Sequence, residues 1–184
     1  MQFLKKWTLL ILIAAIVMVY PSQASATRVM LEIIPRKQVM SNWCWAACAQ
    51  MIGECFGKSY TQGEIVEEIK GESVNEGGTL EELADAIKFT SKCSTKILKD
   101  TISFSKVKSE IRDSNPFAIR IFFDWEWRQH AVVGAGYDDE STNESVYIFD
   151  PWTSGAKYYS YEALSDGTEF DGLFGTWTGT ITLT

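Results

Sequence analysis

The sequence predicts an α+β domain, with helices in its first half and antiparallel strands in its second. Two observations carry this prediction. Between residues 38 and 113, apolar residues recur at the spacing of helical faces and follow polar residues that can cap a helix. From Phe117 onward the apolar period falls to two, as it does in strands. We expect a helical lobe packed on a sheet lobe, with a ligand bound in a cleft between them.

The first 26 residues indicate a secretory signal peptide. Lys5 and Lys6 precede an apolar run over residues 7–20, and Ala24-Ser25-Ala26 is an A-x-A cleavage site. The run is shorter than the roughly 20 residues of a membrane-spanning helix, although a retained N-terminal anchor is the alternative. Cleavage would leave one domain over residues 27–184. We therefore expect a secreted protein, extracellular or periplasmic, with no stable membrane association after cleavage.

Cys44 lies in the first turn of the first predicted helix. Ser41 or Asn42 can serve as its N-cap, and Gly57 can close its C-terminus. One face of this helix consists of Cys44, Ala47, Cys48, Met51, Ile52 and Cys55. The positive end of the helix dipole favours a thiolate at Cys44. With a histidine nearby, such a cysteine can have a pKa of roughly 3.5–7.5, against about 8.5 for a free thiol.

The segment Gln38 to Ala47, which reads Q-V-M-S-N-W-C-W-A-A, resembles the nucleophile region of papain-like cysteine peptidases. It is most similar to compact bacterial members, the effector-type proteases and the bacteriocin-leader peptidases. The resemblance implies a papain-like two-lobed domain, with the nucleophile helix packed on a C-terminal antiparallel sheet. It also implies that Cys44 is the nucleophile, and that the Gln38 side chain and the Cys44 N–H form an oxyanion hole.

Only residues 27–37 separate the predicted cleavage site from Gln38. This stretch is too short for the inhibitory pro-segment of papain-like zymogens. We therefore expect activity on export, restrained by a proteinaceous inhibitor or by narrow specificity.

Three more helices are predicted. Capping boxes open the first two, at Thr61 with Glu64 and at Thr79 with Glu82, and the third runs from Ser103 or Ser105 to Asp113. Strands are predicted over residues 117–123, 130–137, 145–150, 157–161 and 173–183. The helices carry no pattern that indicates chemistry of their own.

His130 is the only histidine in the chain, and it opens the strand whose neighbour along the chain ends at Asp150. If the hairpin between them is centred near Glu140, the two residues lie directly opposite each other, with Cβ atoms about 4.5–5.5 Å apart. His130 would then take the proton of Cys44 and pass it to the leaving amine, while Asp150 would fix the imidazole ring. The resemblance agrees, because bacterial relatives have a similar Asp-Pro at a strand end, where plant papains use asparagine.

Aromatic and acidic residues near this pair suggest further features of the site. By resemblance to papains, Trp152 could shield the His130–Asp150 hydrogen bond from water. Asp124 and Glu126 could make the cleft acidic and favour basic substrates.

The other three cysteines are predicted to be structural. Export favours one disulfide, between Cys93 and either Cys55 or Cys48, and the position of Cys55 at a helix end favours the first pairing. Cys48 would then be a buried thiol. A zinc site is a poorer interpretation, because the C-x3-C-x6-C spacing lacks the usual C-x2-C pair.

These features predict a secreted cysteine peptidase that hydrolyses peptide bonds through a Cys44–His130–Asp150 triad and a thioester. A transglutaminase-like amide acyl transferase, or an inactive papain-like module that binds a peptide, is the alternative. We expect a peptide or protein substrate, no cofactor or metal, and a monomer. The formal net charge of −7 argues against nucleic acid as a partner.

Overall fold

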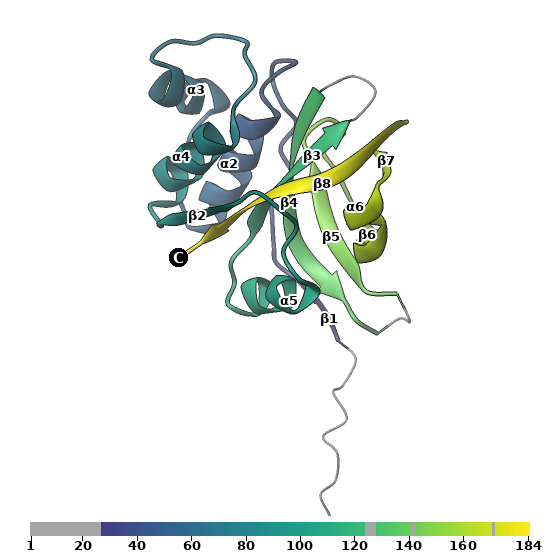
Figure 1. Cartoon of the computed structure of the whole chain (residues 1–184). Coiled ribbons are helices and arrows are strands. Elements are labelled where there is room, and N and C mark those ends of the chain that lie inside the picture. The colour runs from purple at the N-terminus through teal and green to yellow at the C-terminus, as the bar shows by residue number, and fades with distance from the viewer. Residues whose placement is uncertain (1–26, 124–127, 141–142, 171) are drawn as a thin grey trace, which may run out of the picture.

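The computed structural model describes residues 27–123, 128–140, 143–170 and 172–184. Helices pack on both faces of an antiparallel sheet, which is an α+β architecture as predicted (Figure 1). The helices are α2 (Cys44–Cys55), α3 (Gln62–Lys70), α4 (Leu80–Ser91), α5 (Phe104–Arg112) and α6 (Tyr161–Asp166). The predicted signal peptide lies outside the described residues. Within the described part of the chain, no helix combines the length and apolar character needed to cross a membrane.

The strands pair in the order β2-β8-β3-β4-β5-β6, with β1 added to β4 and β7 added to β8. Their bounds are β1 (Arg28–Met30), β2 (Thr95–Leu98), β3 (Phe117–Phe123), β4 (Arg128–Asp138), β5 (Ser145–Asp150), β6 (Gly155–Ser160), β7 (Thr168–Phe170) and β8 (Leu173–Leu183). The sequence predicted β3, β4, β5, β6 and β8 close to these positions. It did not predict the short strands β1, β2 and β7 or the helix α6.

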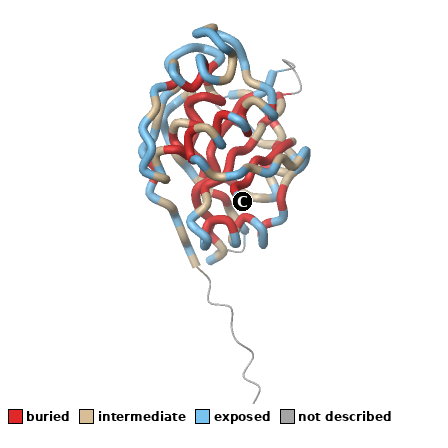
Figure 2. Tube along the Cα trace, turned by 90° about the vertical axis from the view of Figure 1, so that its left-hand side faces the viewer, coloured by how far each residue is buried: buried red, intermediate tan, exposed pale blue. Residues whose placement is uncertain are grey.

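The sheet separates two hydrophobic cores. Helices α2, α3 and α4 pack against one face, whereas α5 and α6 pack against the other (Figure 1). Strand β3 contributes to both, because Ala118 faces the first core while Phe117 and Ile119 face the second. Figure 2 shows the buried chain running through the middle of the molecule, beneath more exposed outer helices and loops.

Both predicted capping boxes are present, and a third predicted helix also begins with a side-chain cap. Thr61 and Thr79 each form a complete capping box, with Glu64 and Glu82 respectively. Ser103 caps α5, where its side chain accepts a hydrogen bond from the N–H of Lys106. These local signals identify the helices because each is satisfied within four residues of sequence.

The predicted cap of α2 is wrong. Its N-cap is Trp43, and no side chain caps this helix among the described residues. The side chain of Asn42 donates to the carbonyl of Asn75 (2.9 Å), and Ser41 accepts from the Asn75 side chain (2.9 Å). A longer-range contact thus replaces the local cap, and the first N–H groups of α2 remain open at the position of Cys44.

Candidate active site

Cys44 begins α2, and the two tryptophans beside it hold one wall of the site. The indole nitrogen of Trp43 donates to the carbonyl of Val74 (2.8 Å), and that of Trp45 donates to the carbonyl of Glu76 (3.1 Å). Gly78 follows, and a Cβ atom there would lie 2.6 Å from Cγ of Trp45. The segment of residues 74–78 is therefore held against α2, and residue 78 must be glycine for the two to approach so closely.

His130 and Asp150 meet at the other wall. Both residues are buried, and Nε2 of His130 lies 2.7 Å from Oδ1 of Asp150. The same oxygen accepts a hydrogen bond from the backbone N–H of Trp152 (2.9 Å). The Trp152 indole stacks on the imidazole, with ring centroids 3.9 Å apart. The ring of His130 is thus fixed both by a hydrogen bond in its plane and by an aromatic contact on its face.

The pairing of β4 with β5 differs from the predicted register. Val133 lies opposite Phe149, so continuing this register would put Asp150 opposite Val132 rather than His130. The hairpin also contains a bulge at Ala135, between Gly134 and Gly136. The side chains still meet, because a shift of two residues keeps both of them on the same face of the sheet.

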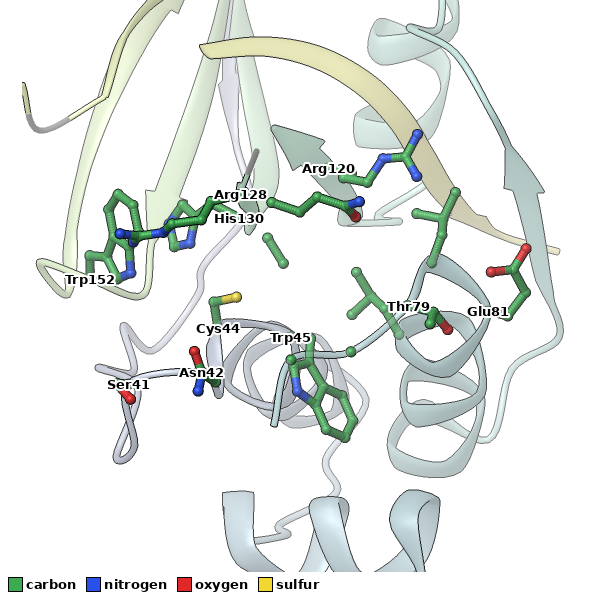
Figure 3. A pocket seen from close by; sticks show the side chains of 16 residues that line it. Ser41, Asn42, Cys44, Trp45, Thr79, Glu81, Arg120, Arg128, His130 and Trp152 are labelled. Carbon is green, nitrogen blue, oxygen red and sulfur yellow. The ribbon is translucent and has the colours of Figure 1, made fainter. Parts of the chain in front are cut away.

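Cys44 and His130 face the same cleft, as Figure 3 shows. Burial opposes a charged sulfur, but the interaction with His130 outweighs it and lowers the pKa of Cys44 below its ordinary value. Burial also opposes the imidazolium, yet Asp150 and Cys44 raise the pKa of His130 to about 9. Nδ1 of His130 has no hydrogen-bond partner among the described residues. Because Nε2 is bonded to Asp150, Nδ1 is the ring nitrogen available to Cys44, and each of the two side chains favours the charged form of the other.

Gln38 does not line this cleft. Its side-chain nitrogen donates to the carbonyls of Met40 (2.9 Å) and Ser41 (2.7 Å), which uses both of its N–H donors. Its backbone N–H donates to the carbonyl of Pro151 (3.0 Å), next to Asp150. The predicted role in an oxyanion hole would require this side chain to turn toward Cys44.

Gln62 holds the segment that carries Gln38, and no local pattern in the sequence identifies this role. Its side-chain oxygen accepts from the N–H of Val39 (2.8 Å), and its nitrogen donates to the carbonyl of Lys37 (2.9 Å). Gln62 is nearly fully buried at the start of α3. One side chain thus fixes the backbone on both sides of Gln38, and only the fold brings these segments together.

Replacing Gln62 with leucine is expected to lower kcat on a peptide substrate by about tenfold, with a smaller change in KM. The loss of both hydrogen bonds, each contributing about 0.5–1.5 kcal/mol, frees the backbone on both sides of Gln38. Steady-state kinetics well below the melting temperature would measure the effect. The control is the alkylation rate of Cys44, which should not change, since Gln62 contacts neither Cys44 nor His130. An equal fall in both rates would mean that the change is a general loss of folding.

The predicted disulfide is absent, since all four cysteines are free thiols. Sγ of Cys55 lies 3.3 Å from the carbonyl of Met51, whereas Sγ of Cys93 lies near the carbonyl of Ser91 (3.8 Å). The two sulfurs are therefore directed at separate backbone groups. Cys48 is fully buried, and this burial raises its pKa well above the ordinary value. Within the described residues, no group of three or more potential metal ligands occurs.

The cleft lies where α2 and α4 face strands β3 and β4, and it has a volume of about 480 Å³. Trp152 and His130 lie toward one end of it, and Arg120 and Glu81 lie toward the other (Figure 3). Residues Gly77 and Gly78 also line it, beside Trp45. Asp124 and Glu126, which could have made the cleft acidic, lie outside the described residues. A volume of this size is typical of ligand sites.

Known structures share this fold. A putative C39-like peptidase from Bacillus anthracis is 18% identical with a TM-score of 0.62, over 86% of this chain and 98% of that one. A double glycine motif protease from an AMS/PCAT transporter, solved in complex with the leader peptide, is 20% identical with a TM-score of 0.53, over 86% and 96%. Digestive procathepsin L 3 of Tenebrio molitor is 13% identical with a TM-score of 0.54, over 87% and 72%. The fold is therefore papain-like, as the sequence predicted.

No curated protein matches the chain in sequence. The profile of the Peptidase_C39 like family, however, matches residues 30–178, which include the Cys44 helix and the His130–Asp150 hairpin. The chain therefore belongs to the Peptidase_C39 like family and is a cysteine-type peptidase.

Proposed function

We propose that the chain is a secreted peptidase that hydrolyses peptide bonds through Cys44, His130 and Asp150. The observation that supports this most directly is the shared cleft of Cys44 and His130, with the buried His130–Asp150 hydrogen bond of 2.7 Å behind it. A structural histidine does not need both a carboxylate partner and a facing thiol whose pKa is lowered.

The reaction follows from these positions. The Cys44 thiolate attacks the peptide carbonyl, and the charge that develops on oxygen meets the open N–H groups at the start of α2. Gln38 would join them after its side chain has turned. The His130 imidazolium protonates the leaving amine, which departs and leaves a thioester on Cys44. His130 then takes a proton from water, and the resulting attack on the thioester releases the acid and restores the thiol.

A peptide is the substrate class that the comparisons favour, because one structure of the same fold holds a leader peptide. Incubation of the purified protein with a peptide library, followed by mass spectrometry, would test hydrolysis directly. We expect products that carry a new carboxylate and a new amine, and no products from Cys44→Ala. Efficient incorporation of an added primary amine in place of water would instead favour the acyl transferase alternative. Binding of peptides without turnover would favour the inactive module.

Secretion is part of the proposal and rests on residues 1–26. Export of the full chain is expected to yield a mature protein that begins at Thr27. Intact-mass measurement of the exported protein would check this. A protein of unchanged mass that stays with the membrane fraction would contradict it and favour the retained anchor.

A further inference from the structure

The cleft continues past the nucleophile to Arg120, a residue that the proposed reaction does not use. Arg120 comes from β3, is half-buried, and lines the cleft at the end away from Trp152 (Figure 3). Glu81, at the start of α4, lines the same end. The positive charge of Arg120 acts on any peptide that enters the cleft.

The backbone around Arg120 fixes its guanidinium group. Arg120 pairs with Gly179 across the sheet, whereas Ile121 pairs with Trp177, so Thr178 is an extra residue in β8. Nε of Arg120 donates to the Thr178 hydroxyl (3.1 Å), and Nη2 donates to the Thr178 carbonyl (2.8 Å). The bulge thus holds the guanidinium in one orientation.

Gly179 supplies the space that this orientation requires. A Cβ atom at residue 179 would lie 3.2 Å from Nε and 3.4 Å from Cζ of Arg120. The guanidinium therefore lies close over the backbone of β8. A pre-oriented guanidinium loses little conformational freedom when it binds a planar anion such as a carboxylate.

Arg120 forms no ion pair with the described residues. Its Nε and Nη2 groups donate to Thr178, and its charge contributes to lowering the pKa of Glu81 at the same end of the cleft. Glu81 is turned toward Lys99, with a 3.3 Å ion pair at the surface. The described lining of the cleft carries two arginines, Arg120 and Arg128, against the single carboxylate of Glu81.

We propose that Arg120 binds a carboxylate of the peptide, so that the enzyme prefers substrates with an acidic group at this end of the cleft. This proposal rests on the proposed peptidase function and names its substrate class. The carboxylate comes either from an Asp or Glu side chain at a fixed distance from the scissile bond or from the C-terminus of the peptide. Both sources present the same planar anion, which the guanidinium fork can bind through two hydrogen bonds.

The first test uses the wild-type protein and a randomised peptide library in two forms, with free and with amidated C-termini. An acidic side chain as the ligand predicts that Asp and Glu are enriched at one position in both forms. A terminal carboxylate predicts cleavage at a fixed distance from the C-terminus in the free form only. A matched pair of peptides that differ by Glu or Gln at the selected position should differ in kcat/KM by about tenfold or more, since hydrogen bonds to charged groups are the stronger ones.

The second test uses variants of Arg120 with the same pair of peptides, or with the free and amidated forms if the terminus is the ligand. Arg120→Met is expected to abolish the preference, leaving the two kcat/KM values within about twofold, because the cation is gone. Arg120→Lys should retain part of it. Glu81→Gln is the matched control, since it removes the carboxylate at the same end of the cleft and should preserve or increase the preference.

The outcomes separate the two proposals. Cleavage by the wild type with no acidic preference, or with a preference for Lys and Arg, would overturn the role of Arg120 while leaving the peptidase intact. A wild-type preference that survives in a folded Arg120→Met protein would overturn it as well. If Arg120→Met does not fold, the ratio of kcat/KM for the matched peptide pair is measured with the wild type at low and high salt. A preference that depends on the charge of Arg120 must weaken as salt rises, so an unchanged ratio would overturn the proposal. Absence of all cleavage, together with an unreactive Cys44, would contradict the proposed function and this proposal with it.

Discussion

Replacing Cys44 with alanine is expected to lower peptide turnover at least about a thousandfold, because no other group can form the thioester. The matched control is Cys48→Ala, four residues later on the same helix. Cys48 is fully buried and its pKa is raised well above the ordinary value, so it cannot replace the nucleophile. We expect this control to keep most of the activity. Both variants remove one sulfur from α2, so a difference between them assigns the chemistry to Cys44 rather than to packing.

Two results would contradict the assignment of the chemistry to Cys44. Equal turnover by wild type and Cys44→Ala would remove Cys44 from the mechanism. Equal losses in Cys44→Ala and Cys48→Ala, with lowered melting temperatures in both, would indicate that the helix and not the thiol is required.

Replacing Asp150 with alanine is expected to reduce kcat by about 10²–10⁴-fold, the range typical of removing the residue that orients a catalytic histidine. The hydrogen bond from Asp150 helps to raise the pKa of His130 to about 9 against the effect of burial. Without it, burial dominates and the pKa of His130 falls. The imidazolium that protonates the leaving amine is then lost at lower pH, so the alkaline limb of the kcat profile moves to lower pH.

Asp150→Asn provides the control for this effect. Asparagine keeps an oxygen that can accept from Nε2 of His130 and from the N–H of Trp152, but it removes the negative charge. We expect it to retain more activity than the alanine variant, with a smaller shift of the alkaline limb. Identical profiles for wild type and Asp150→Ala would show that Asp150 does not act on His130.

The same raised pKa affects folding stability. Because the pKa of His130 is higher in the folded chain than the usual 6.5, protonated His130 contributes stability that is fully present below about pH 6.5. This contribution is lost as the pH rises through about 9. Both this stability contribution and the activity are therefore expected to decline as the pH rises through about 9.

Much of the fold follows from local sequence signals. The capping boxes at Thr61 and Thr79 and the period of two after Phe117 are short-range patterns, and the structure has the corresponding helices and strands. The contact between His130 and Asp150 also followed from sequence, although the assumed register was wrong by two residues. A β-strand tolerates that error because its side chains alternate between faces with a period of two.

The features that the sequence did not reveal depend on contacts between distant segments. The start of α2 has no local cap because Asn42 bonds instead to Asn75. The two hydrogen bonds of the Gln62 side chain join α3 to the segment before Cys44. The orientation of Arg120 depends on a bulge at Thr178, far along the chain. No local pattern encodes these pairings, since each needs the fold to be formed first.

The most direct test of the account is the rate of Cys44 alkylation by iodoacetamide from acid to alkaline pH, resolved by mass spectrometry. Cys55 is an internal control in the same molecule, because burial of its sulfur and the charge of Glu54 raise its pKa to about 11. We predict that Cys44 reacts well below the free-thiol pKa of about 8.5, that His130→Ala abolishes this acid reactivity, and that Cys55 reacts only at alkaline pH in both proteins. Reaction of Cys44 only near the free-thiol value, unchanged in His130→Ala, would contradict the thiolate–imidazolium pair on which the proposed peptidase depends.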